Sequence, residues 1–148
     1  MTPIEPEVAR MGIVPVVVAS GADEGIRIAD ALRAGGLPIA EITFRVEGAH
    51  EALRAIARER PDVPVGAGTV ISVDQVDLAA DCGARFLVSP GTSESVVDRA
   101  RVRGLPIVPG VATATEVMKA LDLGLTTLKF FPAATLGGTA GLQSLAAP

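Results

Sequence analysis

The sequence is poor in aromatic residues, cysteine and histidine, and each shortage excludes a class of protein or site. It has no Trp and no Tyr, and aromatic residues make up 3% of its 148 positions. Its single cysteine, Cys82, cannot form an internal disulfide and is typical of a reducing compartment. With one histidine, and with no carboxylates clustered at ligand spacing, we expect no metal site and no cofactor.

Basic charge and long apolar runs are also lacking. The net charge is -4 and the isoelectric point is about 5.0, whereas a nucleic-acid or anionic-membrane partner would favour a basic face. The longest apolar runs are too short to span a bilayer. The apolar stretch 13–19 follows Glu5 and Glu7, which have the wrong charge for a signal peptide. We therefore expect a cytoplasmic protein with no nucleic-acid and no membrane partner.

What the chain does contain is Ala, Val, Leu and Ile, which dominate the 49% of hydrophobic residues. Short Val- and Ile-rich runs alternate with amphipathic stretches that end in glycine, a pattern that predicts β/α units around a parallel sheet. Strands are expected at 13–19, 38–44, 63–68, 85–89, 106–109 and 126–131. Because no break in composition separates these six units, residues 1–148 are expected to form a single domain.

The later units share an internal repeat of helix, glycine, strand and proline. The repeat runs from Gly83 to Pro90, from Gly104 to Pro109 and from Gly124 to Pro132. Each glycine is expected to adopt the left-handed conformation after a helix, and each proline to mark the point where a strand no longer needs an amide donor. Helix starts are expected at Ser72, with Gln75 three residues later, and at Thr113, with Glu116 three residues later.

Six β/α units fit either an open doubly wound sheet or part of a closed (β/α)8 barrel, and their periodicity does not choose between the two. A dinucleotide-binding fold would need a glycine-rich phosphate loop. The segment 19–23 has one glycine, and Gly66-Ala67-Gly68 opens a loop without the third glycine of that motif. The dinucleotide interpretation is therefore weakly supported.

Glu41 is the only one of the 17 acidic residues that lies within an expected strand. Alternation along the segment 40–45 places Glu41, Thr43 and Arg45 on one face and the apolar residues on the other. The apolar face would meet the helices, so the polar face would point into a barrel. A carboxylate in that interior needs a partner or a catalytic role.

The two lysines occupy different environments. Lys119 follows Glu116 by three residues on an expected helix, where an exposed ion pair is the ordinary interpretation. In contrast, Lys129 is expected to point inward with Phe131 from the last strand, where it would lose hydration. Loss of hydration favours the neutral amine that attacks a carbonyl. A buried ion pair of Lys129 with Glu41 that serves packing alone is the alternative.

Five motifs in one order and spacing resemble the bacterial 2-keto-3-deoxy-6-phosphogluconate (KDPG) aldolases, also known as 4-hydroxy-2-oxoglutarate (KHG) aldolases. The motifs are Glu41-Ile42-Thr43-Phe44-Arg45, Gly66-Ala67-Gly68-Thr69-Val70, Val88-Ser89-Pro90-Gly91, Pro109-Gly110-Val111-Ala112-Thr113 and Leu128-Lys129-Phe130-Phe131-Pro132-Ala133. The resemblance implies a class I aldolase of the Entner-Doudoroff pathway on an α/β, (β/α)8 TIM-type barrel. It further implies a metal-independent enzyme, usually a homotrimer.

The resemblance also implies a role for six residues. Lys129 matches the lysine that forms a Schiff base with pyruvate or a 2-keto acid, and Glu41 matches the general acid/base that acts through a water. Arg45 matches the anchor of the substrate carboxylate, and Thr69 would add a hydroxyl to the same group. Phe131 would be the apolar wall beside the imine and Pro90 a residue that shapes the site. For these last two, core packing is the stronger interpretation from sequence alone.

The chain departs from this family at its end. The family continues past the segment that matches 137–148 for two more β/α units, which hold the substrate phosphate, and about six units are expected here. The implied reaction is cleavage of KDPG to pyruvate and glyceraldehyde 3-phosphate, and of 4-hydroxy-2-oxoglutarate to pyruvate and glyoxylate. The alternative is a catalytically silent, incomplete barrel that acts as an assembly or interaction module.

Overall fold

Helices and strands alternate along the whole of the described chain. The computed structural model describes residues 6–147. The helices are α1 (Pro6–Met11), α2 (Ala22–Ala34), α3 (Ala49–Glu59), α4 (Val73–Asp81), α5 (Glu94–Val102), α6 (Ala114–Asp122) and α7 (Gly138–Leu145). The strands are β1 (Val16–Val17), β2 (Ala40–Thr43), β3 (Val65–Gly68), β4 (Leu87–Ser89), β5 (Ile107–Val111) and β6 (Lys129–Phe130). All six strands expected from the sequence are confirmed.

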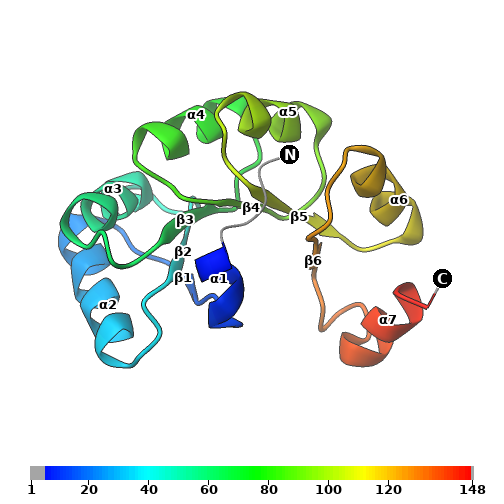
Figure 1. Ribbon diagram of the computed structural model, residues 1–148, viewed down its shortest axis with the longest axis horizontal. Coiled ribbons are helices and arrows are strands. Elements are labelled where there is room, and N and C mark those ends of the chain that lie inside the picture. The colour runs from blue at the N-terminus through cyan, green and yellow to red at the C-terminus, as the bar shows by residue number, and fades with distance from the viewer. Residues whose placement is uncertain (1–5, 148) are drawn as a thin grey trace.

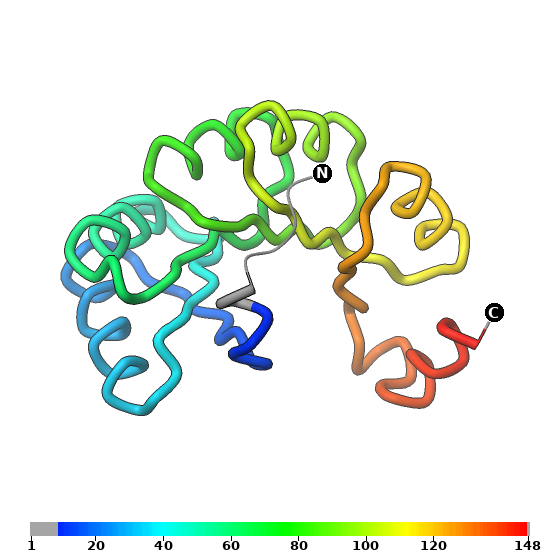
Figure 2. Tube along the Cα trace, viewed as in Figure 1, coloured from blue at the N-terminus to red at the C-terminus, as the bar shows by residue number. Residues whose placement is uncertain are grey.

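The strands form one parallel sheet in the order β1-β2-β3-β4-β5-β6. Figure 1 shows this sheet as an open arc, with α2 to α6 along its outer side and α1 on its inner side. Within residues 6–147, β1 and β6 are the two edges and do not pair with each other. Six units of a TIM-type barrel are therefore present, and the barrel is open between β6 and β1 (Figure 2).

Two apolar clusters fill the two sides of the sheet. The larger cluster lies between strands and helices and includes Ile42, Leu53 and Leu87. The smaller cluster contains the buried residues Ile39, Phe86 and Val88, with Met11 of α1 packed against them. Phe86 and Leu87 are neighbours in the chain but belong to different clusters, as the alternation of side chains in a strand requires. The second cluster therefore fills the inner side of the arc.

The expected helix ends are confirmed, since Gly83, Gly104 and Gly124 have φ values of +89°, +70° and +73°. The expected helix starts are also confirmed. The Ser72 hydroxyl accepts a hydrogen bond from the Gln75 amide, and Thr113 and Glu116 form a complete capping box.

One expectation about the strand ends was wrong. Pro109 does not end its strand but lies inside β5, where its Cα pairs with that of Ser89. The strand continues because Gly110 and Val111 pair with Lys129 and Phe130 of β6. A proline is tolerated at this position because pairing with the next strand begins one residue later.

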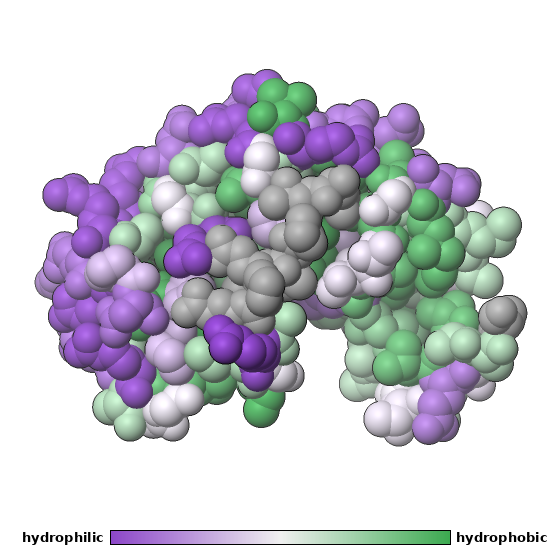
Figure 3. All heavy atoms as spheres, in the orientation of Figure 1, coloured by the Kyte–Doolittle hydropathy of each residue, from purple (hydrophilic) through white to green (hydrophobic). Residues whose placement is uncertain are grey.

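Exposed apolar side chains gather towards the carboxyl-terminal end of the arc. Met118 and Leu121 of α6 are 65% and 55% exposed, and Figure 3 shows hydrophobic surface over this part of the molecule. At the other edge, Val16 and Val18 are about half exposed. The described part of the chain contains no helix that is both long and apolar enough to cross a membrane.

Candidate active site

Glu41 lies on the inner face of β2, as its alternation with apolar neighbours predicts. Ala40 and Ile42 are fully buried in the larger cluster, with Phe44 packed against it. Glu41 points the other way, and its side chain is only 5% exposed. The Thr43 hydroxyl, also buried, donates to the carbonyl oxygen of Val17 and so links β2 to β1. The strand thus fixes a buried carboxylate on the inner side of the sheet.

Lys129 meets this carboxylate from the far end of the sheet. Its Nζ lies 3.7 Å from Oε1 of Glu41 and 5.1 Å from the centre of the Phe131 ring, and its side chain is 25% exposed. Leu128 and Phe130, the neighbours of Lys129 in sequence, turn to the helix side, where they line an apolar groove with residues of α6 and α7. The prediction that Lys129 and Phe131 share the inner side is consistent with this geometry.

The environment of Glu41 disfavours its charged form. Burial raises the pKa of this carboxyl above its ordinary value, while the charges of Lys129 and Arg45 act in the opposite direction without cancelling the effect. The separation of 3.7 Å is longer than a hydrogen bond, and within residues 6–147 Oε1 of Glu41 has no hydrogen-bond partner. A carboxyl group in this state can exchange a proton with a bound molecule or a water.

Arg45 and Thr69 are brought together at the carboxyl ends of β2 and β3. The Nε of Arg45 donates to Oγ1 of Thr69 over 3.1 Å. Thr69 has a φ of +59°, which is unusual for a β-branched residue, and this backbone conformation carries its hydroxyl to Arg45. Because Arg45 is exposed, the rest of its guanidinium fork is available to a carboxylate from solution.

Pro90 follows β4 and lies over the strand that pairs with Lys129. A Cβ on Gly110 would stand 2.0 Å from the Pro90 carbonyl oxygen, and Gly110 is the register partner of Lys129. Pro90 also lines a hollow of about 350 Å³ with Ile71, Thr92 and other residues of the loops after β3 and β4. Phe131 is half-buried beside the lysine. Both residues therefore stand at the same end of the sheet as Arg45.

The other lysine, Lys119, does not form the ion pair that its spacing from Glu116 predicts. The Glu116 carboxylate accepts hydrogen bonds from the backbone amides of Ala112 and Thr113, and Lys119 makes no ion pair within the described part of the chain. The Glu116 carboxylate, which the spacing predicts to pair with Lys119, thus caps the start of α6 instead.

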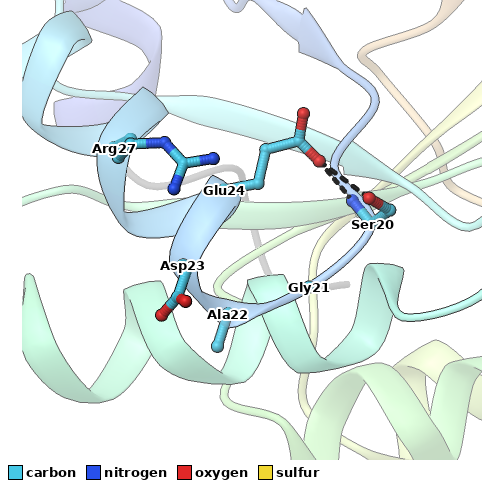
Figure 4. Close-up of a pocket in the computed structure, with 6 residues that line it drawn as sticks. All are labelled: Ser20, Gly21, Ala22, Asp23, Glu24 and Arg27. Atoms are coloured by element: carbon cyan, nitrogen blue, oxygen red, sulfur yellow. Dashed lines mark hydrogen bonds between the residues drawn. The ribbon is translucent and has the colours of Figure 1, made fainter.

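A hollow lined by polar residues lies elsewhere, where β1 leads into α2. It has a volume of about 610 Å³ and is lined by Ser20, Gly21, Ala22, Asp23, Glu24 and Arg27 (Figure 4). The amide and hydroxyl of Ser20 both donate to Oε2 of Glu24, at 2.8 and 2.9 Å. These hydrogen bonds lower the pKa of the Glu24 carboxyl. With two carboxylates and one arginine, this hollow is not suited to a phosphate, in agreement with the weak dinucleotide-loop pattern.

The sequence interpretation missed the role of the two glycines in β3. Both lie within β3, as the expected strand 63–68 predicts, and not in a phosphate-binding loop. A Cβ on Gly66 would collide with the Phe86 ring, and a Cβ on Gly68 would collide with Glu41. Two glycines at alternate positions of a strand are a signal that neighbouring side chains occupy the space above them. Among residues 6–147, no group of three His, Cys, Asp or Glu side chains could hold a metal ion.

The fold and the inner-face residues define a parallel β/α barrel protein with a lysine and a buried carboxylate in contact. The family model for KDPG and KHG aldolase matches residues 4–148. The chain is 45% identical over 139 residues to the 2-dehydro-3-deoxy-phosphogluconate aldolase of Treponema pallidum (strain Nichols), covering 94% of this chain and 66% of that protein. It therefore belongs to the KDPG and KHG aldolase family.

Solved structures agree with this assignment. The KDPG aldolase of Zymomonas mobilis ZM4 with 3-phosphoglycerate superposes with a TM-score of 0.89 at 38% identity, over 98% of this chain and 70% of that chain. The KDPG aldolase from Legionella pneumophila, with pyruvate captured at low pH as a covalent carbinolamine intermediate, gives 0.86 at 36% identity, over 90% and 65% of the respective chains. The present chain thus spans about two thirds of the length of these proteins.

Proposed function

We propose that this chain carries the Schiff-base centre of a pyruvate-dependent class I aldolase, with Lys129 as the nucleophile and Glu41 as the general acid/base. The observation that carries the proposal is the contact of 3.7 Å between the two side chains on the inner side of the sheet. Membership of the KDPG and KHG aldolase family and the carbinolamine captured in the Legionella relative support it.

The proposed reaction begins when the neutral amine of Lys129 attacks the ketone carbon of the 2-keto acid. The carbinolamine that forms loses water, with Glu41 supplying the proton to the leaving hydroxyl through a bound water, and a protonated imine results. Glu41, now a carboxylate, accepts the proton of the C4 hydroxyl. The bond between C3 and C4 then breaks, and the aldehyde leaves. The electron pair of the broken bond moves towards the imine nitrogen of Lys129 and forms an enamine.

The second half of the reaction returns the enzyme to its starting state. The enamine takes a proton at C3 from Glu41 by way of water, which restores the protonated imine. Hydrolysis of this imine releases pyruvate and the neutral amine, and the proton that the hydrolysis frees returns to the Glu41 carboxylate. Burial favours the protonated form of Glu41, and Lys129 and Arg45 favour its charged form, so both states are accessible in one cycle. The same group can therefore donate and accept protons in alternate steps.

Arg45 is proposed to hold the carboxylate of the keto acid, with Thr69 as its support. The hydrogen bond from Arg45 Nε to the Thr69 hydroxyl leaves the terminal nitrogens of the guanidinium to face an anion. Phe131 is proposed as the apolar wall beside the imine, and Pro90 as the residue that shapes the rim. Both assignments rest on their position near Lys129 and on the family motif.

The proposed substrates are KDPG, which would give pyruvate and glyceraldehyde 3-phosphate, and 4-hydroxy-2-oxoglutarate, which would give pyruvate and glyoxylate. The names of the relatives support this choice. We also propose that residues 1–148 act as one domain in the cytoplasm and associate as a homotrimer. Exposed apolar residues at the carboxyl ends of β2 and β3, such as Val46 and Ile71, support association.

Trapping with borohydride tests the proposed function directly. Incubation with pyruvate and sodium borohydride should reduce the imine and add one pyruvate-derived group to the chain, detected by mass spectrometry. Lys129→Ala should abolish the adduct, whereas Lys119→Ala, which changes an exposed lysine, should leave it at the parent level. No adduct on the parent chain would instead favour the silent, incomplete barrel, and equal trapping in the two variants would remove Lys129 from the mechanism.

A further inference from the structure

The inner face of β3 carries no side chain at all. Val65 and Ala67 point to the helix side and belong to the larger apolar cluster. The alternate positions, Gly66 and Gly68, face the interior and are glycines. These two glycines pair in register with Glu41 and Thr43 of β2. β3 therefore leaves space on the inner side of the sheet for side chains that come from the two adjacent strands.

The two neighbouring strands fill this space with one side chain each. The ring of Phe86, which precedes β4, lies over Gly66, where a Cβ would be 2.3 Å from Cε2. Glu41 of β2 lies over Gly68, where a Cβ would be 2.1 Å from Oε1 and 2.6 Å from Cγ. Real Cβ atoms essentially never approach a heavy atom closer than 3.0 Å. A methyl group at either position must therefore displace the side chain above it.

At Gly68 the group that a new methyl would meet first is Glu41. The three heavy atoms nearest to the hypothetical Cβ all belong to the Glu41 side chain. Gly68 also lacks a positive φ, so alanine is compatible with its backbone. The atom closest to the new methyl, Oε1, is the same oxygen that lies 3.7 Å from Lys129 Nζ. The space above Gly68 thus sets the position of the carboxylate relative to the lysine.

We propose that Gly68 is a positioning residue, whose missing side chain creates the notch in which the Glu41 carboxylate is held against Lys129. The inference rests on the proposed function, since it deepens the role given there to Glu41. Gly66 provides the matched control, because it lies on the same face of the same strand and makes room for Phe86 instead.

The first test follows the ionisation of Glu41 itself and needs no catalytic activity. The pKa of its carboxyl is measured by carbon NMR in the parent chain, in Gly68→Ala and in Gly66→Ala, with Glu41→Gln assigning the signal. The groups that face Glu41 are Lys129 and Arg45, which are unchanged in these variants. Gly68→Ala should lower the pKa towards its ordinary value as the carboxylate moves into water, and Gly66→Ala should leave it near the parent value. Equal behaviour of the two variants would overturn the proposal.

The second test asks whether Glu41 is the group with which the methyl introduced by Gly68→Ala collides. Urea midpoints are compared for Gly68→Ala, Glu41→Ala and the double variant. Removing the Glu41 side chain empties the notch, so Gly68→Ala should cost much less in the Glu41→Ala background than in the parent. If Gly68→Ala alone does not fold and the double variant does, the proposal is supported in the same way. Equal losses in both backgrounds would contradict it.

The third test asks whether the notch at Gly68 affects formation of the Schiff base. If the parent chain traps pyruvate with borohydride, Gly68→Ala should slow trapping by about 100-fold, since a misplacement of about 1 Å can cost that much. Gly66→Ala should stay within a few-fold of the parent when it is folded. Unimpaired trapping by Gly68→Ala would overturn the positioning role. A parent chain that forms no adduct would count against the proposed function alone, because the first two tests still decide the role of Gly68.

Discussion

Oε1 of Glu41 lies 3.7 Å from Nζ of Lys129, although the two residues belong to β2 and β6, which are separated in the open sheet by β3, β4 and β5. Because these two strands are not adjacent, the contact between the side chains depends on the curvature of the sheet. The carboxylate is almost completely buried, and the amine is partly open to the interior. This arrangement gives an amine access to a substrate carbonyl while a neighbouring acid stays out of water.

The first prediction concerns proton transfer by Glu41. Glu41→Gln keeps the shape of the side chain but cannot move a proton, so exchange of the methyl protons of pyruvate with deuterated solvent should slow by about 100-fold or more. Proton NMR of pyruvate in D2O measures this rate, and it reports on enamine formation without an aldehyde substrate. Glu51→Gln, an exposed change on α3, should keep the parent rate. An unchanged rate in Glu41→Gln would remove this residue from the mechanism.

The second prediction concerns stability against pH. Because the pKa of Glu41 is raised in the folded state above its ordinary value of 4.5, the folded chain binds more protons than the unfolded chain between these two values. Its stability should therefore fall as the pH rises through that window and level off above it. Glu41→Gln mimics the protonated acid, so its advantage over the parent should grow through the same window, as urea unfolding at several pH values would measure.

Glu24 supplies a control of opposite sign. Hydrogen bonds from Ser20 lower the pKa of the Glu24 carboxyl, so its contribution to stability is present above its ordinary pKa and is lost as the pH falls. Glu24→Gln should therefore show no gain with rising pH. Glu41→Gln and Glu24→Gln should thus change the pH dependence of stability in opposite directions. If both changed it in the same direction, the conclusion that the folded state disfavours the charged form of Glu41 would be wrong.

The positions of Glu41 and Lys129 could be predicted because they depend on local alternation. Each is a charged residue between apolar neighbours in a short strand, and the apolar neighbours must face the helices. The role of Gly68 could not be predicted in this way, because a glycine does not indicate which side chain fills the space beside it. The roles proposed for Arg45 and Thr69 rest on the family resemblance, and the left-handed backbone of Thr69 has no signal in its sequence.

The same limit applies to the strand ends and to the lysine on α6. Pro109 suggested a strand end, but pairing of the next two residues with β6 extends β5 beyond it. Lys119 suggested an ion pair with Glu116, but two backbone amides at the start of α6 bind that carboxylate. For Pro109 the competing interaction is pairing with a strand distant in sequence. For Lys119 it is the local cap of α6, and the spacing of Thr113, Glu116 and Lys119 fits both a cap and an ion pair without indicating which is stronger.

The third prediction separates the strain of Thr69 from its hydroxyl. Thr69→Gly relieves the positive φ, which costs a β-branched residue about 1 to 2 kcal/mol, but it raises the entropy of the unfolded chain by a similar amount. Stability should thus stay within about 1 kcal/mol of the parent. The pyruvate concentration for half-maximal trapping should rise about 3- to 10-fold, since Arg45 loses one hydrogen-bond partner.

Thr69→Ser is the matched control, because it keeps the hydroxyl that Arg45 contacts. Its half-maximal pyruvate concentration should lie close to that of the parent in the same trapping assay. A large loss of stability in Thr69→Gly, or equal weakening of pyruvate binding in the two variants, would show that Thr69 supports the backbone and not Arg45.

The fourth prediction concerns substrate choice by the 148-residue chain. The family resemblance assigns phosphate recognition to two β/α units that no segment of this chain matches, whereas Arg45, Thr69 and Lys129, which would hold the pyruvate end, are all present. Loss of charge-assisted contacts to a phosphate costs about 2 to 5 kcal/mol of binding. Activity of this chain should therefore lack the preference for a phosphorylated substrate.

Pyruvate release from KDPG and from 4-hydroxy-2-oxoglutarate, at matched concentrations below saturation, measures this preference. The two rates should be similar, and light scattering of the same sample should establish the state of association in which they are measured. A strong preference for KDPG would contradict the prediction, because the phosphate site would then have to be supplied from within this chain or by a neighbouring copy. The turn at Gly137 and Gly138, where both residues have positive φ values and exposed or half-buried backbones, would be the first segment to alter in that case. Gly137→Ala and Gly138→Ala should leave the ratio of the two rates unchanged if the prediction is correct, since neither residue then contacts the substrate.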